Sequence, residues 1–321
     1  MIFAGTPDVA VPTLAALANS SHEVVGAVTR PPARQGRSSR LVPSPVAEFA
    51  LAHNIPLLET SAPSSPESLD WIEGADADLG VVVAYGALLR PDVLEAPRLG
   101  WINLHFSALP DLRGAAPVQR AILRGDVDLA TSVFLLDEGM DTGPVISTVT
   151  RPVSAGATSG EALALLAQAS VGQVMEAVAD LEDGIARPIP QNVKSGSIAP
   201  KLSKRDGLVS FQETARQTVD RVRAVTPAPG AWTTAPSGQP MKLRAVSLDP
   251  VAGGPAQPGA IELDREGLRV RCADSWVRVG QVAPAGKTWM NAADWARGAR
   301  LEPNDRLGAE PNENTNEGTK A

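Results

Sequence analysis

An asparagine and a histidine stand two residues apart at the end of a short apolar run, at Asn103 and His105. The run 101–104 is typical of a strand buried in a sheet, and period-two alternation places both polar side chains on one face. An amide N–H and an imidazole at one strand end can stabilise an oxyanion and move a proton. A histidine alone more often hydrogen-bonds a loop carbonyl, but the Pro-, Gly- and Arg-rich segment 107–117 that follows favours a functional site.

A second polar cluster follows the next apolar run, at residues 131–136. Three acidic residues, Asp137, Glu138 and Asp141, fall within five positions, and Gly139 and Gly143 accompany them. Taken alone, this composition is typical of a solvated turn, because Asp and Gly are common turn formers. Beside an asparagine and a histidine at a neighbouring strand end, it predicts a carboxylate that orients and polarises the imidazole.

The elements that must position these clusters alternate between strands and helices. Apolar runs at 23–29, 78–84, 101–104 and 131–136 indicate strands buried on both faces of a parallel sheet. Helices are predicted at 8–19, 44–53, 66–73 and 116–124, and one long helix between Thr158 and Gly184. This alternation predicts a doubly wound, Rossmann-like, mainly parallel α/β sheet, whose ligands bind beyond the carboxyl ends of the strands. The first strand ends in Gly5-Thr6-Pro7, which lacks the three glycines of an NAD or FAD fingerprint.

The sequence pattern changes after residue 188. Residues 189–205 contain prolines and glycine without hydrophobic periodicity, and we interpret them as a linker. A helix is predicted over 211–225, and short strands over 239–248, 260–263, 267–272 and 275–282 predict a smaller all-β, OB-like barrel. We therefore expect domains at 1–188 and 206–308, and a disordered polar tail at 309–321.

The composition bounds the class of protein. Of 321 residues, 43% are hydrophobic and 20% are charged, as in a globular protein of two domains. No run of 18 apolar residues and no signal-peptide pattern occur, so we expect no transmembrane helix and a cytoplasmic location. A single cysteine, Cys272, excludes an intrachain disulfide, and only three histidines make a metal site unexpected.

Charge is distributed unevenly along the chain. The net charge of −7 combines −10 in residues 1–200 with +5 in residues 201–308, and the remainder lies in the tail. A positive second domain favours a polyanionic partner, although ordinary solvated surface charge explains it equally well. In the first domain, Arg30, Arg34, Arg37 and Arg40 share one stretch without an acid. This stretch predicts a loop that orders on contact with phosphates, with a solvated surface loop as the alternative.

Several motifs resemble those of the folate-dependent formyltransferases. They are Asn103-Leu104-His105, Ser107-Ala108-Leu109-Pro110, Arg113-Gly114-Ala115-Ala116-Pro117 and the acidic segment 137–143. Within that group, residues 4–7, 82–86, 199–204, 229–232 and 295–300 are similar to the methionyl-tRNA formyltransferase family. The resemblance runs from residue 2 to about residue 308 in matching order.

The resemblance implies an activity in translation initiation and assigns its residues. The formyl group of 10-formyltetrahydrofolate would pass to the α-amine of methionyl-initiator tRNA. Asn103 and a protonated His105 would donate to the oxyanion, while Asp141 would favour the imidazolium and accept the ammonium proton, directly or through water. A folate site is implied at Ser107, Ala108, Leu109, Pro110, Val83, Ala84, Tyr85 and Gly86, and tRNA contacts at Arg30, Arg34, Arg37, Arg40, Lys201 and Lys204. We expect a monomer with no metal and no membrane partner.

Two alternatives share parts of this pattern. Formyltransferases acting on sugar nucleotides or glycinamide ribonucleotide, and formylfolate hydrolases, would keep Asn103, His105 and Asp141 but would not need residues 199–204 or a positive second domain. A catalytically silent RNA-binding module would break that trio of residues, and the trio is complete here. Phe106, Ala108 and Asp111 depart from the family pattern beside the expected folate pocket.

Overall fold

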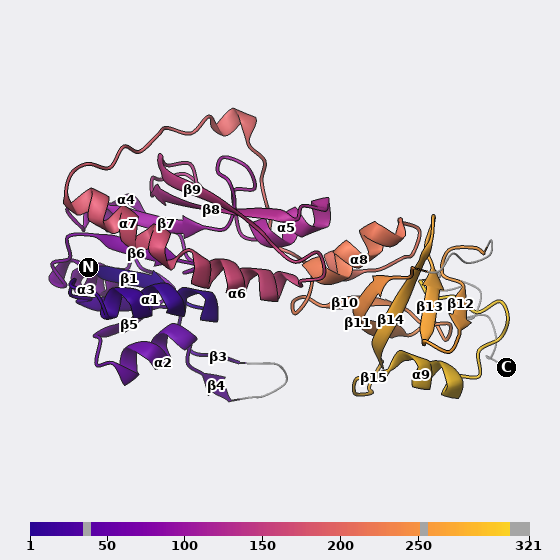
Figure 1. Ribbon diagram of the computed structural model, residues 1–321. Coiled ribbons are helices and arrows are strands. Elements are labelled where there is room, and N and C mark those ends of the chain that lie inside the picture. Colours follow the sequence, from indigo (N-terminus) through magenta and orange to yellow (C-terminus); the bar gives the residue numbers. More distant parts are fainter. Residues whose placement is uncertain (35–39, 251–255, 309–321) are drawn as a thin grey trace, which may run out of the picture. The chain divides into compact units, whose positions relative to one another are not determined.

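The protein folds into two compact units, which Figure 1 shows in a computed structural model that describes residues 1–34, 40–250 and 256–308. The first unit comprises residues 1–118, 128–153 and 161–201, and the second comprises 119–127, 154–160 and the chain from 202. Two stretches that the sequence places in the first domain therefore group with the second unit. The predicted domain boundaries at 188 and 205 stay a prediction, and the predicted disordered tail, 309–321, lies outside the described residues.

A seven-stranded sheet forms the centre of the first unit. Its strand order is β5-β2-β1-β6-β7-β8-β9, and β5, β2, β1, β6 and β7 are parallel. The strands are β1 (Ile2–Gly5), β2 (Gly26–Thr29), β5 (Leu57–Glu59), β6 (Gly80–Val83), β7 (Trp101–His105), β8 (Asp128–Leu135) and β9 (Val145–Pro152), and a small ribbon pairs β3 (Ala33–Arg34) with β4 (Leu41–Val42). The prediction of a mainly parallel, Rossmann-like sheet is confirmed.

The direction of β8 differs from the prediction. It runs antiparallel to β7, with Ile102 opposite Leu135 and His105 opposite Ser132, and β9 is antiparallel to β8. The apolar run 131–136 carries no information on direction, because a strand buried on both faces reads the same in either orientation. The chain leaves β8 beside the beginning of β7, so the acidic loop does not start at the strand end that carries His105.

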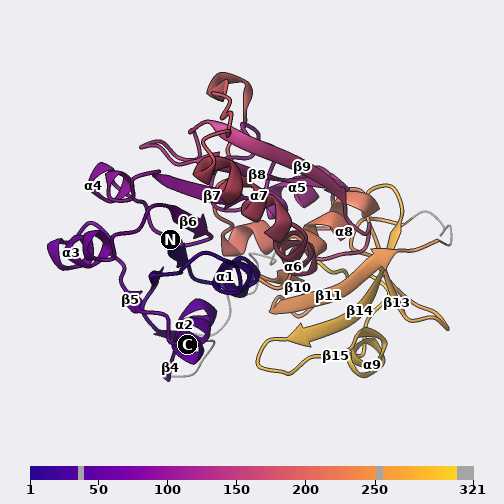
Figure 2. The ribbon, with the colours of Figure 1, turned by 60° about the vertical axis from the view of Figure 1, so that its left-hand side comes forward.

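Helices cover both faces of this sheet. In Figure 2, α3 (Pro66–Gly74) and α4 (Pro91–Glu95) lie on one side, and α1 (Val11–Ala18) and α2 (Pro45–Ala52) lie on the other, where α1 packs against α7 (Val171–Glu182). The other helices described before residue 201 are η1 (Asp8–Ala10), α6 (Ser159–Ala169), η2 (Val193–Ser195) and α5 (Pro117–Arg124), most of which groups with the second unit. The side chains of Ser44 and Ser65 accept hydrogen bonds at the N-termini of α2 and α3, and Pro45 and Pro66 follow them, as is typical of helix starts.

The single long helix predicted between Thr158 and Gly184 is two helices, α6 and α7. Ser170 separates them, and its hydroxyl donates to Thr131 Oγ1 on β8 at 3.0 Å. The stretch Ser159–Glu182 is long and apolar enough to cross a membrane. The sequence analysis did not identify it, because polar residues interrupt the stretch and it contains no run of 18 apolar residues. In the structure Leu166, Val174 and Ala177 of this stretch are buried, and α7 packs on β8 and β9 as a core helix does.

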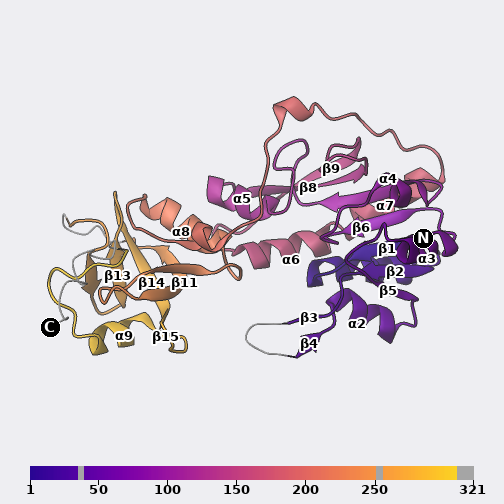
Figure 3. The ribbon, with the colours of Figure 1, turned by 180° about the vertical axis from the view of Figure 1, so that it is seen from behind.

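The second unit contains a curved antiparallel sheet with the strand order β10-β11-β14-β13-β12. Its strands are β10 (Ala231–Thr234), β11 (Pro240–Leu248), β12 (Ile261–Leu263), β13 (Leu268–Arg271), β14 (Trp276–Pro284) and β15 (Met290–Asn291), which pairs with β14. Figure 3 shows α8 (Ala215–Ala224) and α9 (Ala292–Gly298) on opposite sides of it, and η3 (Lys204–Gly207) precedes α8. The predicted all-β second domain is confirmed, and the helix predicted over 211–225 begins four residues late, where Thr214 forms its capping box.

Candidate active site

A cavity of about 500 Å³ in the first unit lies at the ends of β6 and β7. Asn103, His105 and Asp141 all line it, so the structure brings together the three residues predicted to act in catalysis. Much of the remaining lining is apolar and includes Leu88, Leu89, Leu94, Phe106, Pro117 and Met140. Among the described residues, two carboxylates, of Asp137 and Asp141, and no lysine or arginine line the cavity.

The imidazole of His105 is held from both sides. Its Nε2 donates to the carbonyl oxygen of Leu112 at 3.0 Å, so that nitrogen carries a proton. Its Nδ1 lies 3.6 Å from Asp141 Oδ2, and the ring meets Phe134 edge to face at 6.4 Å between centroids. Because Nε2 is engaged by the backbone, Nδ1 is the nitrogen that can exchange a proton on the Asp141 side.

The carboxylate of Asp141 is fixed by the backbone around it. Gly114 N–H donates to Asp141 Oδ2 at 2.7 Å, and Gln191 Nε2 donates to the carbonyl oxygens of Asp141 and Gly143 at 3.0 and 2.6 Å. Asp137 shapes the same loop, since its Oδ1 accepts from Gly139 N–H and the Thr142 hydroxyl. The side chain of Asp141 is 16% exposed, so it is largely withdrawn from water yet borders the cavity.

Asn103 presents an unsatisfied amide to this space. It lies on β7 two residues before His105, and its Oδ1 is buried without a hydrogen-bond partner among the described residues. Buried polar atoms are nearly always paired in folded proteins, so an orphaned one beside a cavity indicates a ligand that completes it.

Left-handed backbone conformations surround the cavity. Ala84, Leu112 and Asp141 have φ values of 49°, 56° and 56°, and Gly114 has 117°. Such conformations cost about 1–3 kcal/mol each at residues other than glycine, and they concentrate at functional sites. At Gly114, a Cβ would also lie 2.9 Å from the Ala199 carbonyl oxygen. The roles of Leu112 and Gly114 could not be predicted from the sequence, although Gly114 belongs to one of the family motifs, because both residues act through backbone atoms and leave no side-chain signal.

The residues predicted to bind folate fall into two groups. Ala84, Tyr85 and Gly86 line the cavity, whereas Val83 is fully buried and does not. Ser107, Ala108, Leu109 and Pro110 do not line it either. Their segment is tied to β8, where Ser132 Oγ donates to the Ser107 carbonyl at 2.8 Å and accepts from Leu109 N–H at 3.2 Å.

Of the three residues that depart from the family pattern, only Phe106 lies at the cavity. Phe106 lines the cavity, and Ala108 is exposed outside it. Asp111 accepts a hydrogen bond from the Ser197 hydroxyl, and its carbonyl accepts one from Ser107 at 2.6 Å. Of these three, Phe106 therefore acts directly on the shape of the cavity.

Tyr85 is anchored within the cavity wall. Its hydroxyl donates to the Thr60 carbonyl at 3.2 Å, and its own carbonyl accepts from the Thr6 hydroxyl at 2.8 Å. Burial of this side chain raises the pKa of Tyr85 to about 12, and the charge of Arg30 opposes that rise. The tyrosine is thus a neutral, rigid part of the wall at physiological pH.

The described residues predicted to contact tRNA belong to both units. Arg30 donates to the Gly86 carbonyl at 3.3 Å, at a residue that lines the cavity. Arg34 and Arg40 are exposed, and Arg37 lies outside the described residues. Lys201 is exposed at the end of the first unit, and Lys204 Nζ lies over the Trp232 ring in the second.

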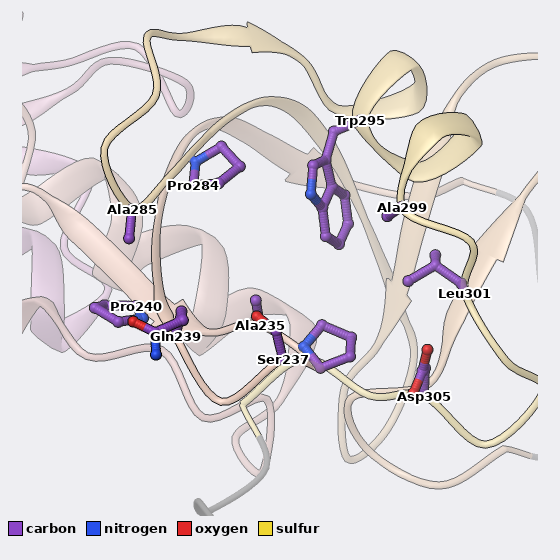
Figure 4. A pocket seen from close by; sticks show the side chains of 11 residues that line it. Ala235, Ser237, Gln239, Pro240, Pro284, Ala285, Trp295, Ala299, Leu301 and Asp305 are labelled. Atoms are coloured by element: carbon purple, nitrogen blue, oxygen red, sulfur yellow. The ribbon is translucent and has the colours of Figure 1, made fainter.

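A second cavity, of about 340 Å³, lies within the second unit (Figure 4). Trp295, Leu301, Pro240 and Pro284 supply much of its lining. The carboxylate of Asp305 is engaged locally, because it accepts from Glu302 N–H at 2.8 Å. This cavity has none of the paired titratable groups that distinguish the first, so the candidate active site is the cavity at Asn103, His105 and Asp141.

Two protein-family models match most of the chain. Residues 1–178 match the formyl transferase model, and residues 201–300 match the model for the formyl transferase C-terminal domain. A methionyl-tRNA formyltransferase of Salinispora arenicola is 47% identical over 302 residues, which cover 94% of this chain and 97% of that protein. A methionyl-tRNA formyltransferase of Thermobifida fusca is 46% identical over 312 residues, which cover 96% of this chain and 99% of that protein.

Solved structures share the fold at lower sequence identity. HypX from Aquifex aeolicus in complex with tetrahydrofolic acid has a TM-score of 0.64 and 17% identity, over 91% of this chain and 46% of that one. WlaRD, a sugar 3N-formyl transferase, has a TM-score of 0.63 and 15% identity, over 89% and 98%. These structures show the fold, and the family models together with the near full-length relatives show that the chain belongs to the methionyl-tRNA formyltransferase family of formyl transferases.

Proposed function

We propose that this chain transfers the formyl group of 10-formyltetrahydrofolate to the α-amine of methionyl-initiator tRNA. Its similarity over nearly the full length to methionyl-tRNA formyltransferases supports the substrate pair. The observation that carries the chemistry is the meeting of Asn103, His105 and Asp141 at one cavity, with the His105 ring held between Leu112 and Asp141.

The reaction exchanges one C–N bond for another. The free amine of the methionyl group attacks the formyl carbon, and negative charge develops on the formyl oxygen while an ammonium forms. Asn103 is the donor that we assign to that oxygen, through its Nδ2, because its side chain lines the cavity. Its Oδ1, which has no partner among the described residues, would accept from an N–H of a substrate. A single oxyanion donor is typically worth ~10²–10³ in rate.

His105 and Asp141 handle the proton in this proposal. The ammonium must lose a proton, and the folate nitrogen must gain one before the C–N bond to the folate breaks. Asp141, fixed by Gly114 N–H and close to His105 Nδ1, is the acceptor that we assign, directly or through a water. The proton that Asp141 takes from the ammonium would pass to His105 Nδ1, which faces it, and from Nδ1 to the folate nitrogen, so Asp141 and His105 return to their starting protonation states.

The cavity fits the formyl donor as a co-substrate. A flat heteroaromatic group requires apolar walls and a few polar contacts, and the cavity combines Leu88, Leu89 and Phe106 with an orphaned amide oxygen. We assign this donor site to the cavity wall at Ala84, Tyr85 and Gly86. The contribution of Ser107–Pro110 would be indirect, through the attachment of this segment to β8.

The partners follow from the same assignment. The tRNA would meet cationic side chains, of which Arg30, Arg34, Arg40, Lys201 and Lys204 are described, and Arg37 remains part of the proposal. Because translation uses the formylated initiator tRNA, the proposed compartment is the cytoplasm. We further propose that a monomer is sufficient, since Asn103, His105 and Asp141 come from one chain.

The deciding experiment offers purified protein 10-formyltetrahydrofolate with methionyl-initiator tRNA, a dTDP-amino sugar or water as acceptor. We expect formyl-methionyl-tRNA, measured by release of formyl-methionine after mild base, and no transfer to the sugar. Transfer to the amino sugar alone would indicate a sugar formyltransferase. Release of formate without transfer would indicate a hydrolase.

A further inference from the structure

Residues 189–199, the first part of the predicted linker, are hydrogen-bonded to the first unit at both ends. Ile189 exchanges two backbone hydrogen bonds with Val145, the first residue of β9, and both are 2.8 Å long. At the other end, Ala199 N–H donates to the Arg113 carbonyl at 2.6 Å. These residues therefore belong to the catalytic unit rather than to a free linker, and we refer to them as the strap.

The strap reaches the loop that holds His105 through the side chain of Ser197. The Ser197 hydroxyl accepts from Leu112 N–H at 3.1 Å and donates to the Asp111 carboxylate. The carbonyl of the same Leu112 accepts from His105 Nε2 at 3.0 Å. Leu112 has a left-handed φ of 56°, a conformation that persists only where neighbouring groups enforce it. The Ser197 hydroxyl therefore fixes the residue whose carbonyl orients the imidazole.

The strap reaches the loop that holds Asp141 through the side chain of Gln191. The Gln191 amide donates to the carbonyl oxygens of Asp141 and Gly143, at 3.0 and 2.6 Å. Asp141 likewise has a left-handed φ of 56°. By bridging two carbonyl groups of one short loop, the amide keeps that loop in the conformation that places Asp141 Oδ2 3.6 Å from His105 Nδ1.

Hydrogen bonds attach the strap more than apolar packing does. Ile189 is 70% exposed and Ile198 is 49% exposed, so the two isoleucines bury little apolar surface. The side chains of Gln191 and Ser197 bond to the loops of the catalytic pair, whereas the hydroxyl of Ser195 donates within the strap, at 2.8 Å. The strap thus contains two comparable serines, one bonded to a catalytic loop and one bonded to the strap itself.

We propose that Gln191 and Ser197 are positioning residues for formyl transfer. Through them, the strap sets the separation of His105 Nδ1 and Asp141 Oδ2. Neither positioning side chain lines the cavity, so each acts through the backbone that it holds. The assigned proton path from Asp141 to His105 requires these two atoms to meet, and a misplacement of about 1 Å can cost roughly 10² in rate. The inference rests on the proposed function for the reaction that the pair serves.

The first test is the formylation rate of four variants. Ser197→Ala and Gln191→Met each remove the side-chain hydrogen bonds to one catalytic loop, and we expect kcat to fall by as much as ~10² with little change in either KM. Ser197→Thr keeps a hydroxyl and should retain most of kcat. Ser195→Ala is the matched control, because it removes a hydroxyl from the same strap and should leave kcat unchanged. Thermal unfolding shows whether each variant is folded.

The second test observes the His105 ring without substrate, by nuclear magnetic resonance of protein that contains isotope-labelled histidine. In the wild type, the proton on Nε2 is buried and bonded to the Leu112 carbonyl, so its signal should be visible. We expect Ser197→Ala to lose that signal through exchange with water, and Ser195→Ala to keep it. The chain has three histidines, and His105→Ala assigns the signal.

The two tests separate this inference from the proposed function. A wild type that does not formylate methionyl-tRNA refutes the proposed function, and the Nε2 signals still decide whether Ser197 positions the ring. An Nε2 signal that Ser197→Ala retains overturns the inference, whatever the activity. Wild-type kcat in both Ser197→Ala and Gln191→Met overturns it as well. So does a loss in Ser195→Ala as large as that in Ser197→Ala, because the strap would then need its hydrogen bonds only for its own stability.

Discussion

Asp141 Oδ2 lies 3.6 Å from His105 Nδ1, although the strands that precede the two residues run in opposite directions. The chain leaves β8 at Leu135, opposite Ile102, and must return along the sheet to reach His105. Asp141 has a left-handed backbone conformation, and Gly114 N–H donates to its carboxylate. These two features place the carboxylate beside His105. The pair thus depends on loop conformation more than on the sheet.

The first prediction concerns the charge of Asp141. Asp141→Asn keeps an oxygen that can accept from Gly114 N–H but removes the carboxylate beside His105 Nδ1. We expect kcat to fall by ~10²–10⁴, the range of general acid–base catalysis, while the melting temperature stays close to that of the wild type. The control is Glu138→Gln in the same loop, an exposed acid for which we expect wild-type activity. Equal losses in both variants would mean that the loop requires negative charge in general.

The second prediction concerns Asn103 and His105 together. Asn103→Ala removes an amide whose Oδ1 has no partner, so we expect a loss of ~10²–10³ in kcat with little loss of stability. The double variant with His105→Ala should lose much less than the product of the single losses, because the two residues serve one transition state. Steady-state kinetics and thermal unfolding of all four proteins measure this. Fully multiplicative losses would indicate independent roles.

The sequence was informative where side chains and periodicity carry the signal. Asn103 and His105 could be placed on one face of a strand because strand alternation is local. The direction of β8 could not be predicted, since its residues are buried on both faces in either orientation. Leu112 and Gly114 were missed for a different reason. They contribute a carbonyl oxygen and an N–H, and the fold alone determines where those point.

The third prediction uses Tyr85, the single tyrosine of the chain. Its pKa is raised by burial from 10.0 to about 12, so folding opposes formation of the tyrosinate. Its contribution to stability is complete below pH 10 and is lost as the pH rises from 10 to about 12. Tyrosinate absorbance at 295 nm should therefore develop near pH 12 in the native protein and near pH 10 in urea. Coincident titrations would contradict the burial of this hydroxyl.

The same residue allows a stability measurement. Tyr85→Phe removes the hydrogen bond to the Thr60 carbonyl, which we expect to cost about 1 kcal/mol at pH 7. Between pH 10 and 12, urea unfolding should show the variant losing stability more slowly than the wild type. A parallel decline in both proteins would mean that other groups determine the alkaline limit.

The fourth prediction concerns Cys272, the single cysteine. Its side chain is fully buried, its Sγ lies 3.4 Å from Thr218 Oγ1, and burial raises its pKa to about 11. Because the thiolate is the reactive form, a thiol reagent at pH 8 should react at least ~10²-fold more slowly with native than with unfolded protein. A native rate equal to the unfolded rate would show that the second unit opens freely. Cys272→Ser supplies the blank.

The fifth prediction concerns a cut in the chain at residue 200. The sequence boundary predicts that residues 1–200 fold alone and retain folate binding, and all residues that line the catalytic cavity do belong to the first unit. Residues 119–127 and 154–160, however, group with the second unit. Arg120 pairs with Asp206 at 3.0 Å, and Arg223 Nε donates to the Ala157 carbonyl at 2.8 Å. These contacts cross the cut.

We therefore expect the fragment 1–200 to bind the folate with reduced stability, and the fragment 201–321 to unfold at lower urea than the second unit of the intact chain. Mixing the two fragments should restore part of the stability of both, because the contacts of Arg120 and Arg223 can form again. Urea unfolding followed by tryptophan fluorescence, with Cys272 reactivity as a probe of the second unit, measures these changes. Two fragments that unfold independently, mixed or apart, would show that the stretches 119–127 and 154–160 contribute nothing to the second unit.

One side chain of α8 tests the same contacts in the intact chain. Asp220 is 2% exposed and accepts from Arg223 Nη1 at 2.6 Å and from Arg216 Nε at 2.9 Å. Asp220→Asn leaves the buried Arg223 without its counter-charge, so we expect a loss of about 3–5 kcal/mol. Arg216→Ala removes the other, more exposed partner of the same carboxylate, and we expect a loss of no more than about 1 kcal/mol. Arg223 also donates to the Ala157 carbonyl. Equal losses of stability in the two variants would mean that the burial of Arg223 does not determine how strongly Asp220 stabilises the second unit.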